Sequence, residues 1–138
     1  GIIKGPHSVF ATVTEKSNAP KSDYFGYRWE QPVKTNMVAF HYGCLEEYGG
    51  WYSNMHVEYL DAEGNWQPVE ATVTPALPES DVVFIQPHFA EFVFEFEPIE
   101  TTAVRVIGDN CRFIHYNKYT KNVAAFVSVS EVQVYEAI

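Results

Sequence analysis

Alternation of apolar and polar residues is the feature that most constrains how this chain can fold. Segments with this two-residue period, bounded by Gly, Pro, Asn and Asp, recur from end to end of the 138 residues, while no helical periodicity lasts three turns. In a strand, such alternation sends one set of side chains to the core and the other to solvent. The sequence therefore predicts an all-β fold.

The predicted strands are short and separated by turn-forming residues. The clearest is 91–97, where Phe92, Phe94 and Phe96 share one face and glutamates occupy most of the other. A Gly-containing turn at 61–65 predicts a hairpin. The hairpin joins 55–59 to 66–69, and further strands are predicted at 9–14, 25–29, 38–42, 104–107 and 126–135, with an interruption at 31–32 and an edge segment or loop at 82–85.

The last predicted strand changes face along its length. Val127 and Val129 share one face, whereas Val132 and Val134 fall on the other. This predicts a bulge or a change of partner near 130–131. Together the segments amount to about eight antiparallel strands, which is typical of a two-sheet sandwich or jelly roll.

Length and charge limit the possible partners. With 46% hydrophobic and 20% charged residues, the chain can form one globular domain over 1–138, and it has no apolar run long enough to span a membrane. A net charge of −9 argues against binding nucleic acid or anionic lipid and leaves neutral or cationic partners. Because the chain begins Gly1-Ile2-Ile3, we expect that it is part of a larger protein, and we expect a monomer.

No sequence pattern favours catalysis. The five histidines show no metal-binding spacing, and Glu46-Glu47 is better explained as a pair of solvated charges than as an acid–base pair. Cys111 and His115 could form a nucleophile and its base, but ordinary loop residues are the commoner interpretation. Cys44 and Cys111 could pair or remain free thiols. We therefore expect no enzyme activity and no transition-metal site.

Aromatic residues make up 16% of the chain, and two loops rich in them favour sugar recognition. A ring face is an apolar platform for a pyranose, and polar side chains bond its hydroxyls, although a peptide could use the same groups. In the loop 43–54, Trp51 and Tyr52 could either stack on a ligand or close the end of the sandwich. The predicted ligand-binding residues, five of them in the loop 111–122, are Trp51, Tyr52, His41, Arg112, His115, Tyr116, Asn117 and Tyr119.

The order of several segments resembles a known family. The segments include 22–33, Gly64-Asn65-Trp66, Ala103-Val104-Arg105-Val106 and the terminal Ser128-Val129-Ser130-Glu131-Val132-Gln133-Val134-Tyr135. Together they resemble the coagulation factor V/VIII type C (discoidin) domains. More narrowly, they resemble the bacterial carbohydrate-binding modules of that galactose-binding-like superfamily. The resemblance starts near residue 9 and spans nearly all the rest of the chain.

This resemblance implies a jelly-roll β-sandwich that binds a glycan without catalysis and is attached to a secreted glycoside hydrolase or surface protein. It implies an extracellular, bacterial cell-surface or periplasmic location. It also implies a structural calcium ion, for which Glu131 matches the family's acid by position and Asp23 and Asn18 are additional candidates. The first loop, 15–23, departs from the family because it lacks the usual Asp-Gly stretch.

Two functions follow from these observations. The first is a non-catalytic carbohydrate-binding module that uses aromatic and polar loops at one end of the sandwich. The alternative is a protein-interaction or spacer domain whose aromatic loops pack against the parent chain. A response to glycans would distinguish the first from the second.

Overall fold

The computed structural model describes residues 2–3, 10–11, 22–45, 50–79, 86–110 and 127–138. These residues form β-strands and no helix, so the all-β prediction is confirmed. Within the described ranges there is no helix of the length and apolarity that a membrane span requires. The strands are β1 (Ile2–Ile3), β2 (Phe10–Ala11), β3 (Ser22–Tyr42), β4 (Tyr52–Leu60), β5 (Trp66–Pro68), β6 (Thr72–Thr74), β7 (Glu91–Asn110) and β8 (Ser128–Glu136).

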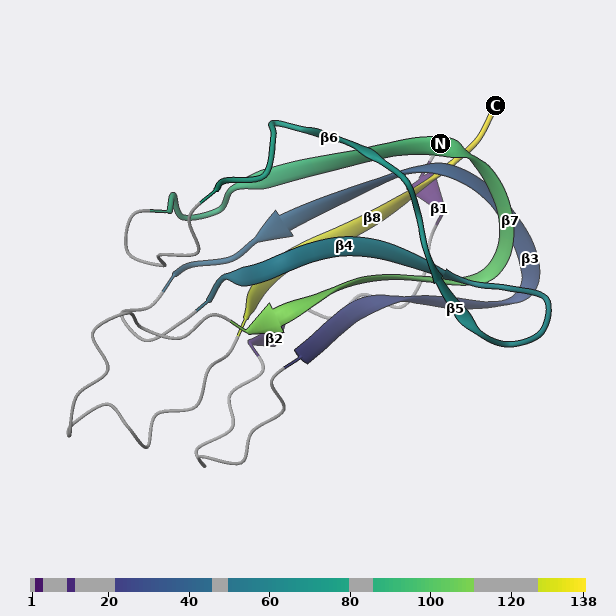
Figure 1. Cartoon of the computed structure of the whole chain (residues 1–138), viewed down its shortest axis with the longest axis horizontal. Coiled ribbons are helices and arrows are strands. Elements are labelled where there is room, and N and C mark those ends of the chain that lie inside the picture. The colour runs from purple at the N-terminus through teal and green to yellow at the C-terminus, as the bar shows by residue number, and fades with distance from the viewer. Residues whose placement is uncertain (1, 4–9, 12–21, 46–49, 80–85, 111–126) are drawn as a thin grey trace.

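One antiparallel sheet folds over on itself to make the two layers of a sandwich. The strand order is β1-β8-β3-β7-β4-β5, with β2 also beside β8 and β6 also beside β7. The two long strands, β3 and β7, pair with each other and curve together at one end of the molecule (Figure 1). The second half of β3 pairs with β8 and with the first half of β7 in one layer. The first half of β3 lies in the other layer, with the second half of β7, β4 and β5.

The bend in β3 falls where the sequence predicts an interruption. The register with β7 shifts between Arg28 and Val33, and again between Thr35 and Met37, but the strand continues through both irregularities. Near the bend, the hydroxyl of the buried Thr35 donates to the Tyr135 carbonyl at 2.6 Å. This bond satisfies the Thr35 hydroxyl and the Tyr135 carbonyl at a point where the ladder is irregular.

The core lies between the two layers and is built from the predicted apolar faces. Phe92, Phe94 and Phe96 of β7 are all buried, as the alternation in 91–97 requires. The predicted hairpin is also present, because Glu58 pairs with Pro68 and Leu60 with Trp66.

The predicted bulge in the last strand is confirmed at Ser130. His41 pairs with Glu131 and Tyr42 with Val129, so Ser130 has no partner in the ladder. Its hydroxyl instead donates to the Tyr42 carbonyl at 2.9 Å. The extra residue lets side chains before and after it point into the same core, and the buried valines are Val127, Val129, Val132 and Val134.

Candidate functional site: an arginine between two aromatic rings

The first two predicted ligand residues lie in the core. Trp51 and Tyr52 are each 2% exposed, and the Trp51 ring stacks on Tyr42 with 4.0 Å between centroids. Burial raises the pKa of the Tyr52 hydroxyl, and that hydroxyl donates to the Asp23 carbonyl at 3.0 Å. Neither ring presents a face to solvent. The alternative stated from the sequence, that these rings close the end of the sandwich, describes their position.

His41 lies on the opposite side of β3 from that core. Its Nδ1 is 3.2 Å from Glu91 Oε2, and its Nε2 is 3.2 Å from Gln133 Oε1. Because successive side chains of a strand alternate in direction, His41 points away from the layer interface into which Tyr42 points. The structure therefore does not bring His41 and Trp51 together on one surface.

The two described calcium candidates are engaged elsewhere. Asp23 Oδ1 accepts the Tyr24 backbone N–H at 2.9 Å, and Glu131 Oε1 accepts from Gln133 Nε2 at 3.1 Å. Within the described ranges no group of three or more His, Cys, Asp and Glu side chains could hold a metal ion. Asn18 lies outside these ranges, so calcium stays a prediction.

The remaining predicted ligand residues also lie outside the described residues. They are Arg112, His115, Tyr116, Asn117 and Tyr119. Cys111 lies outside the described residues too. Cys44 is described, and it carries a free thiol whose sulfur is 3.5 Å from His88 Nδ1.

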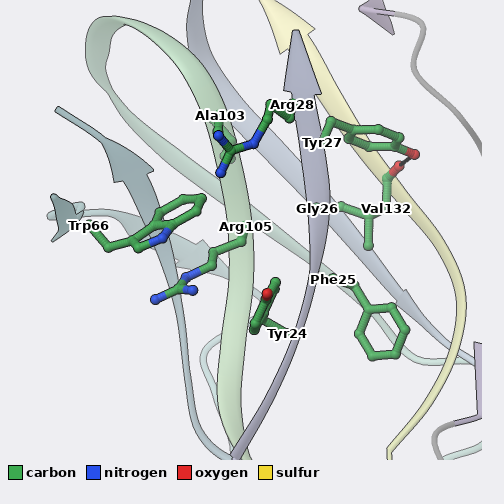
Figure 2. Close-up of a pocket in the computed structure, with 10 residues that line it drawn as sticks. Tyr24, Phe25, Gly26, Tyr27, Arg28, Trp66, Ala103, Arg105 and Val132 are labelled. Atoms are coloured by element: carbon green, nitrogen blue, oxygen red, sulfur yellow. Dashed lines mark hydrogen bonds between the residues drawn. The ribbon is translucent and has the colours of Figure 1, made fainter. Parts of the chain in front are cut away.

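A different group of chemically active side chains gathers on the outer face of the layer formed by β3, β7, β4 and β5. Arg105 of β7 lies between two rings, with its Cζ 4.0 Å from the Trp66 centroid and 4.7 Å from the Tyr24 centroid. Tyr24 is 56% exposed. Figure 2 shows Trp66, Arg105 and Tyr24 on one side of β3, with Phe25 and Tyr27 on the other.

An ion pair fixes the orientation of the Arg105 guanidinium. Its Nε and Nη2 donate to Glu58 Oε1 at 2.8 and 2.6 Å, and both side chains are 16% exposed. His56 supports Glu58 from the other side, with Nε2 3.1 Å from Glu58 Oε2. The Arg105 Nη1 donors have no hydrogen-bond partner among the described residues, so they can bond a ligand.

The turn before β5 holds Trp66 in place. The Asp61 carboxylate accepts the backbone N–H of Asn65 at 2.8 Å and of Glu63 at 3.0 Å, and it also accepts from Gln67 Nε2 at 3.0 Å. The Asn65 and Gln67 bonds hold the pKa of Asp61 below its usual value. Gly64 occupies the left-handed position at φ 86° that closes the turn. The indole is therefore presented from a fixed hairpin end.

Two small residues make room between the large ones. Gly26 pairs with Arg105, and Arg28 pairs with Ala103, so a glycine and an alanine lie among long side chains on this face. With core-facing residues from the other side of β3, they line a pocket of about 440 Å³, a size suited to a small ligand. We call it the Trp66 hollow; its lining residues are Tyr24, Phe25, Gly26, Tyr27, Arg28, Trp66, Ala103, Val104, Arg105 and Val132.

We expect acid to lower the free energy of unfolding, because acid protonates Glu58. Burial on its own raises the pKa of this carboxyl, but the hydrogen bonds and charges of Arg105 and His56 outweigh burial and leave the pKa below its usual value. A lowered pKa adds stability above the unfolded-state value of about 4.3, and that stability is lost as the pH falls through the folded-state value.

We therefore expect Glu58→Gln to cost about 2 kcal/mol of unfolding free energy at pH 7 and much less below about pH 4. Urea unfolding of both proteins across this pH range measures the difference. A difference that stays constant from pH 7 to pH 3 would contradict the assignment of the pKa shift.

Sequence reasoning missed the Trp66 hollow, although it noticed several of its parts. Trp66 begins the second strand of the predicted hairpin, and Tyr24 and Gly26 fall within the segment 22–33 that carries the family resemblance. Only the register places Tyr24, Arg105 and Trp66 together, since they lie on β3, β7 and β5. The local signal was a small residue, Gly26, in the middle of an aromatic strand.

Comparison with known proteins supports the class of fold. No family model matches the chain, and no curated protein sequence matches it. Among solved structures, the chain is similar to one from the Streptococcus pneumoniae beta-galactosidase BgaA, with a TM-score of 0.62 and 14% identity over 96% of this chain and 77% of that chain. A protein assigned as an alpha-L-fucosidase from Bacteroides thetaiotaomicron matches at a TM-score of 0.47 and 11% identity, over 94% of this chain and 27% of that one.

The chain is thus an all-β sandwich, a fold that it shares with the structure from the beta-galactosidase. At these identities the likeness concerns the fold and assigns no activity. The narrower resemblance to discoidin domains stays a prediction.

Proposed function

We propose that this domain is a non-catalytic carbohydrate-binding module and that it belongs to a larger glycan-active or surface protein. The observation that carries the proposal is the Trp66 hollow, where two aromatic rings and two arginines surround a depression. Ring faces match the C–H side of a pyranose, and guanidinium N–H groups donate to its hydroxyls. The fold that the chain shares with part of a beta-galactosidase is compatible with such an attachment.

The rings and the guanidinium have separate roles in this proposal. Tyr24, which is 56% exposed, provides most of the open ring surface, and Trp66 forms the opposite wall of the hollow. Arg105 is held in place by Glu58 before a ligand arrives, so little side-chain entropy is lost on binding. Because the hollow is open and small, we expect a Kd of roughly 0.1–1 mM.

Trp66→Ala tests the location of the site. We expect it to weaken glycan binding by about tenfold or more, because it removes both a wall of the hollow and one of the rings that orient Arg105. The measurement is a glycan-array screen of the 138-residue chain, followed by calorimetric titration of each hit.

Trp29→Phe is the matched control for this experiment. Trp29 lies on β3 but does not line the hollow, and its buried Nε1 has no hydrogen-bond partner among the described residues. The Trp29→Phe protein should therefore bind glycans as the wild type does. Equal affinities of the wild type and Trp66→Ala would place the site elsewhere, for example in the loop 111–122 that the sequence predicts.

One observation favours the alternative function, an interaction or spacer domain. Phe89 is 65% exposed and adopts φ 55°, a left-handed conformation that is strained for a bulky residue. An exposed, strained ring can serve a protein contact. Two results together would favour this function over glycan binding. The glycan array would be blank, and this domain would co-elute with the rest of its parent protein unless it carried Phe89→Ser.

A further inference from the structure

The Trp66 hollow concentrates positive charge in an acidic chain. The described residues include three Lys and Arg side chains, Arg28, Lys34 and Arg105, and two of these three line the hollow. None of the ten lining residues is acidic. The net charge of −9 is therefore a poor guide to this surface. At physiological salt, charges more than roughly 8 Å away are largely screened, so the groups at the hollow decide what it attracts.

The two arginines differ in how their charge is balanced. Arg105 forms an ion pair with Glu58, whereas no described acid lies within ion-pair distance of Arg28. Figure 2 shows Arg28 extending from β3 across β7, on the side of the hollow where Trp66 lies. Among the described residues, the Arg105 guanidinium is thus paired with an acid and the Arg28 guanidinium is not, and both lie next to two rings.

We propose that the Trp66 hollow selects a sugar that carries a carboxylate, a uronic acid, over the neutral sugar of the same shape. In this arrangement the pyranose lies beside the stack of Tyr24, Arg105 and Trp66, against the ring surface that Arg105 leaves open. Its hydroxyls accept from the Nη1 donors of Arg105, and its carboxylate pairs with Arg28. A planar guanidinium bonds a carboxylate through two parallel hydrogen bonds, which a hydroxyl cannot match. This inference rests on the proposed function and names the class of sugar for the same site.

The probes separate charge from ring shape. Calorimetric titrations of the 138-residue chain use galacturonate, glucuronate and mannuronate trisaccharides, their methyl esters, and the neutral trisaccharides of the parent hexoses. We expect at least one uronate to bind about tenfold more tightly than both its methyl ester and its neutral counterpart. Equal affinities within all three sets would overturn the preference for a carboxylate.

Variants then assign the preference to one residue. Arg28→Gln should bring the ratio of uronate to neutral-sugar affinity down to about one, and Arg28→Lys should restore only part of that ratio. Lys34→Gln is the matched control, because it removes one positive charge from a position that does not line the hollow. A preference that survives in Arg28→Gln, or that falls equally in Lys34→Gln, would overturn the role of Arg28.

The outcomes distinguish this inference from the function on which it rests. If uronates and neutral sugars bind equally and Trp66→Ala weakens both, the hollow is a glycan site without the proposed preference. If no glycan binds, both the function and the preference are overturned.

Discussion

Replacing Trp51 with alanine is expected to lower the free energy of unfolding by about 4 kcal/mol, the typical cost of removing a large buried aromatic side chain. The indole is 2% exposed, stacks on Tyr42 at 4.0 Å and meets Phe92 edge-on at 5.8 Å. Its loss opens a cavity where the surrounding rings cannot fully close. Urea unfolding followed by circular dichroism measures the change, provided that the slope against denaturant is unchanged.

Trp66→Ala is the matched control for this stability prediction. Trp66 is half-buried on the outer face and contacts Arg105, so its removal should cost only about 1 kcal/mol. The two tryptophans thus have opposite expected roles, Trp51 in stability and Trp66 in binding. A cost for Trp51→Ala no larger than that for Trp66→Ala would contradict the position of Trp51 in the core.

Gly26→Ala should be the second large loss, at about 3 kcal/mol. A Cβ at this position would overlap the Val104 carbonyl oxygen and lie 2.7 Å from the Arg105 Cα, both of which are backbone atoms of the paired strand. Backbone of β7 cannot move aside without disturbing its own ladder with β4. We therefore expect a lower midpoint of thermal unfolding and a distorted Trp66 hollow.

Gly64→Ala provides the comparison for Gly26→Ala. Gly64 has a left-handed φ of 86°, but no atom lies within 4 Å of the position that a Cβ would take. Its replacement should therefore cost only the conformational penalty, about 1 kcal/mol. If thermal unfolding showed Gly26→Ala to be no more harmful than Gly64→Ala, the close approach of β3 to β7 would be contradicted.

The sequence was sufficient to predict those parts of the fold that local patterns determine. The Phe92 to Phe96 alternation, the hairpin around Gly64 and the bulge near Ser130 each depend on side-chain period or turn chemistry within a few residues. The continuity of β3 through Pro32 was not predictable in the same way. It depends on pairing with β7, whose residues Ala103 and Thr101 pair with Arg28 and Val33 on either side of Pro32 and lie far from them along the chain.

The candidate site shows the same division between local and long-range information. The position of Trp51 in the predicted loop 43–54 leaves open whether its ring is exposed, and packing against Tyr42 and Phe92 buries it. The partners of Arg105 come from three other strands. If any of these strands paired one residue out of register, its side chain that contacts Arg105 would point to the opposite face of the sheet. Such a cluster can be recognised only after the strands have been paired.

The position of the glycan on the domain is the claim to test most directly. Each tryptophan indole N–H gives its own signal in a ¹H–¹⁵N correlation spectrum, so titrating the ¹⁵N-labelled chain with the tightest glycan from the array observes Trp29, Trp51 and Trp66 separately. We predict a saturable shift of the Trp66 signal and of the Arg28 and Arg105 side-chain signals, with the Trp29 and Trp51 signals unchanged. Saturable binding that leaves Trp66 unmoved would contradict the account.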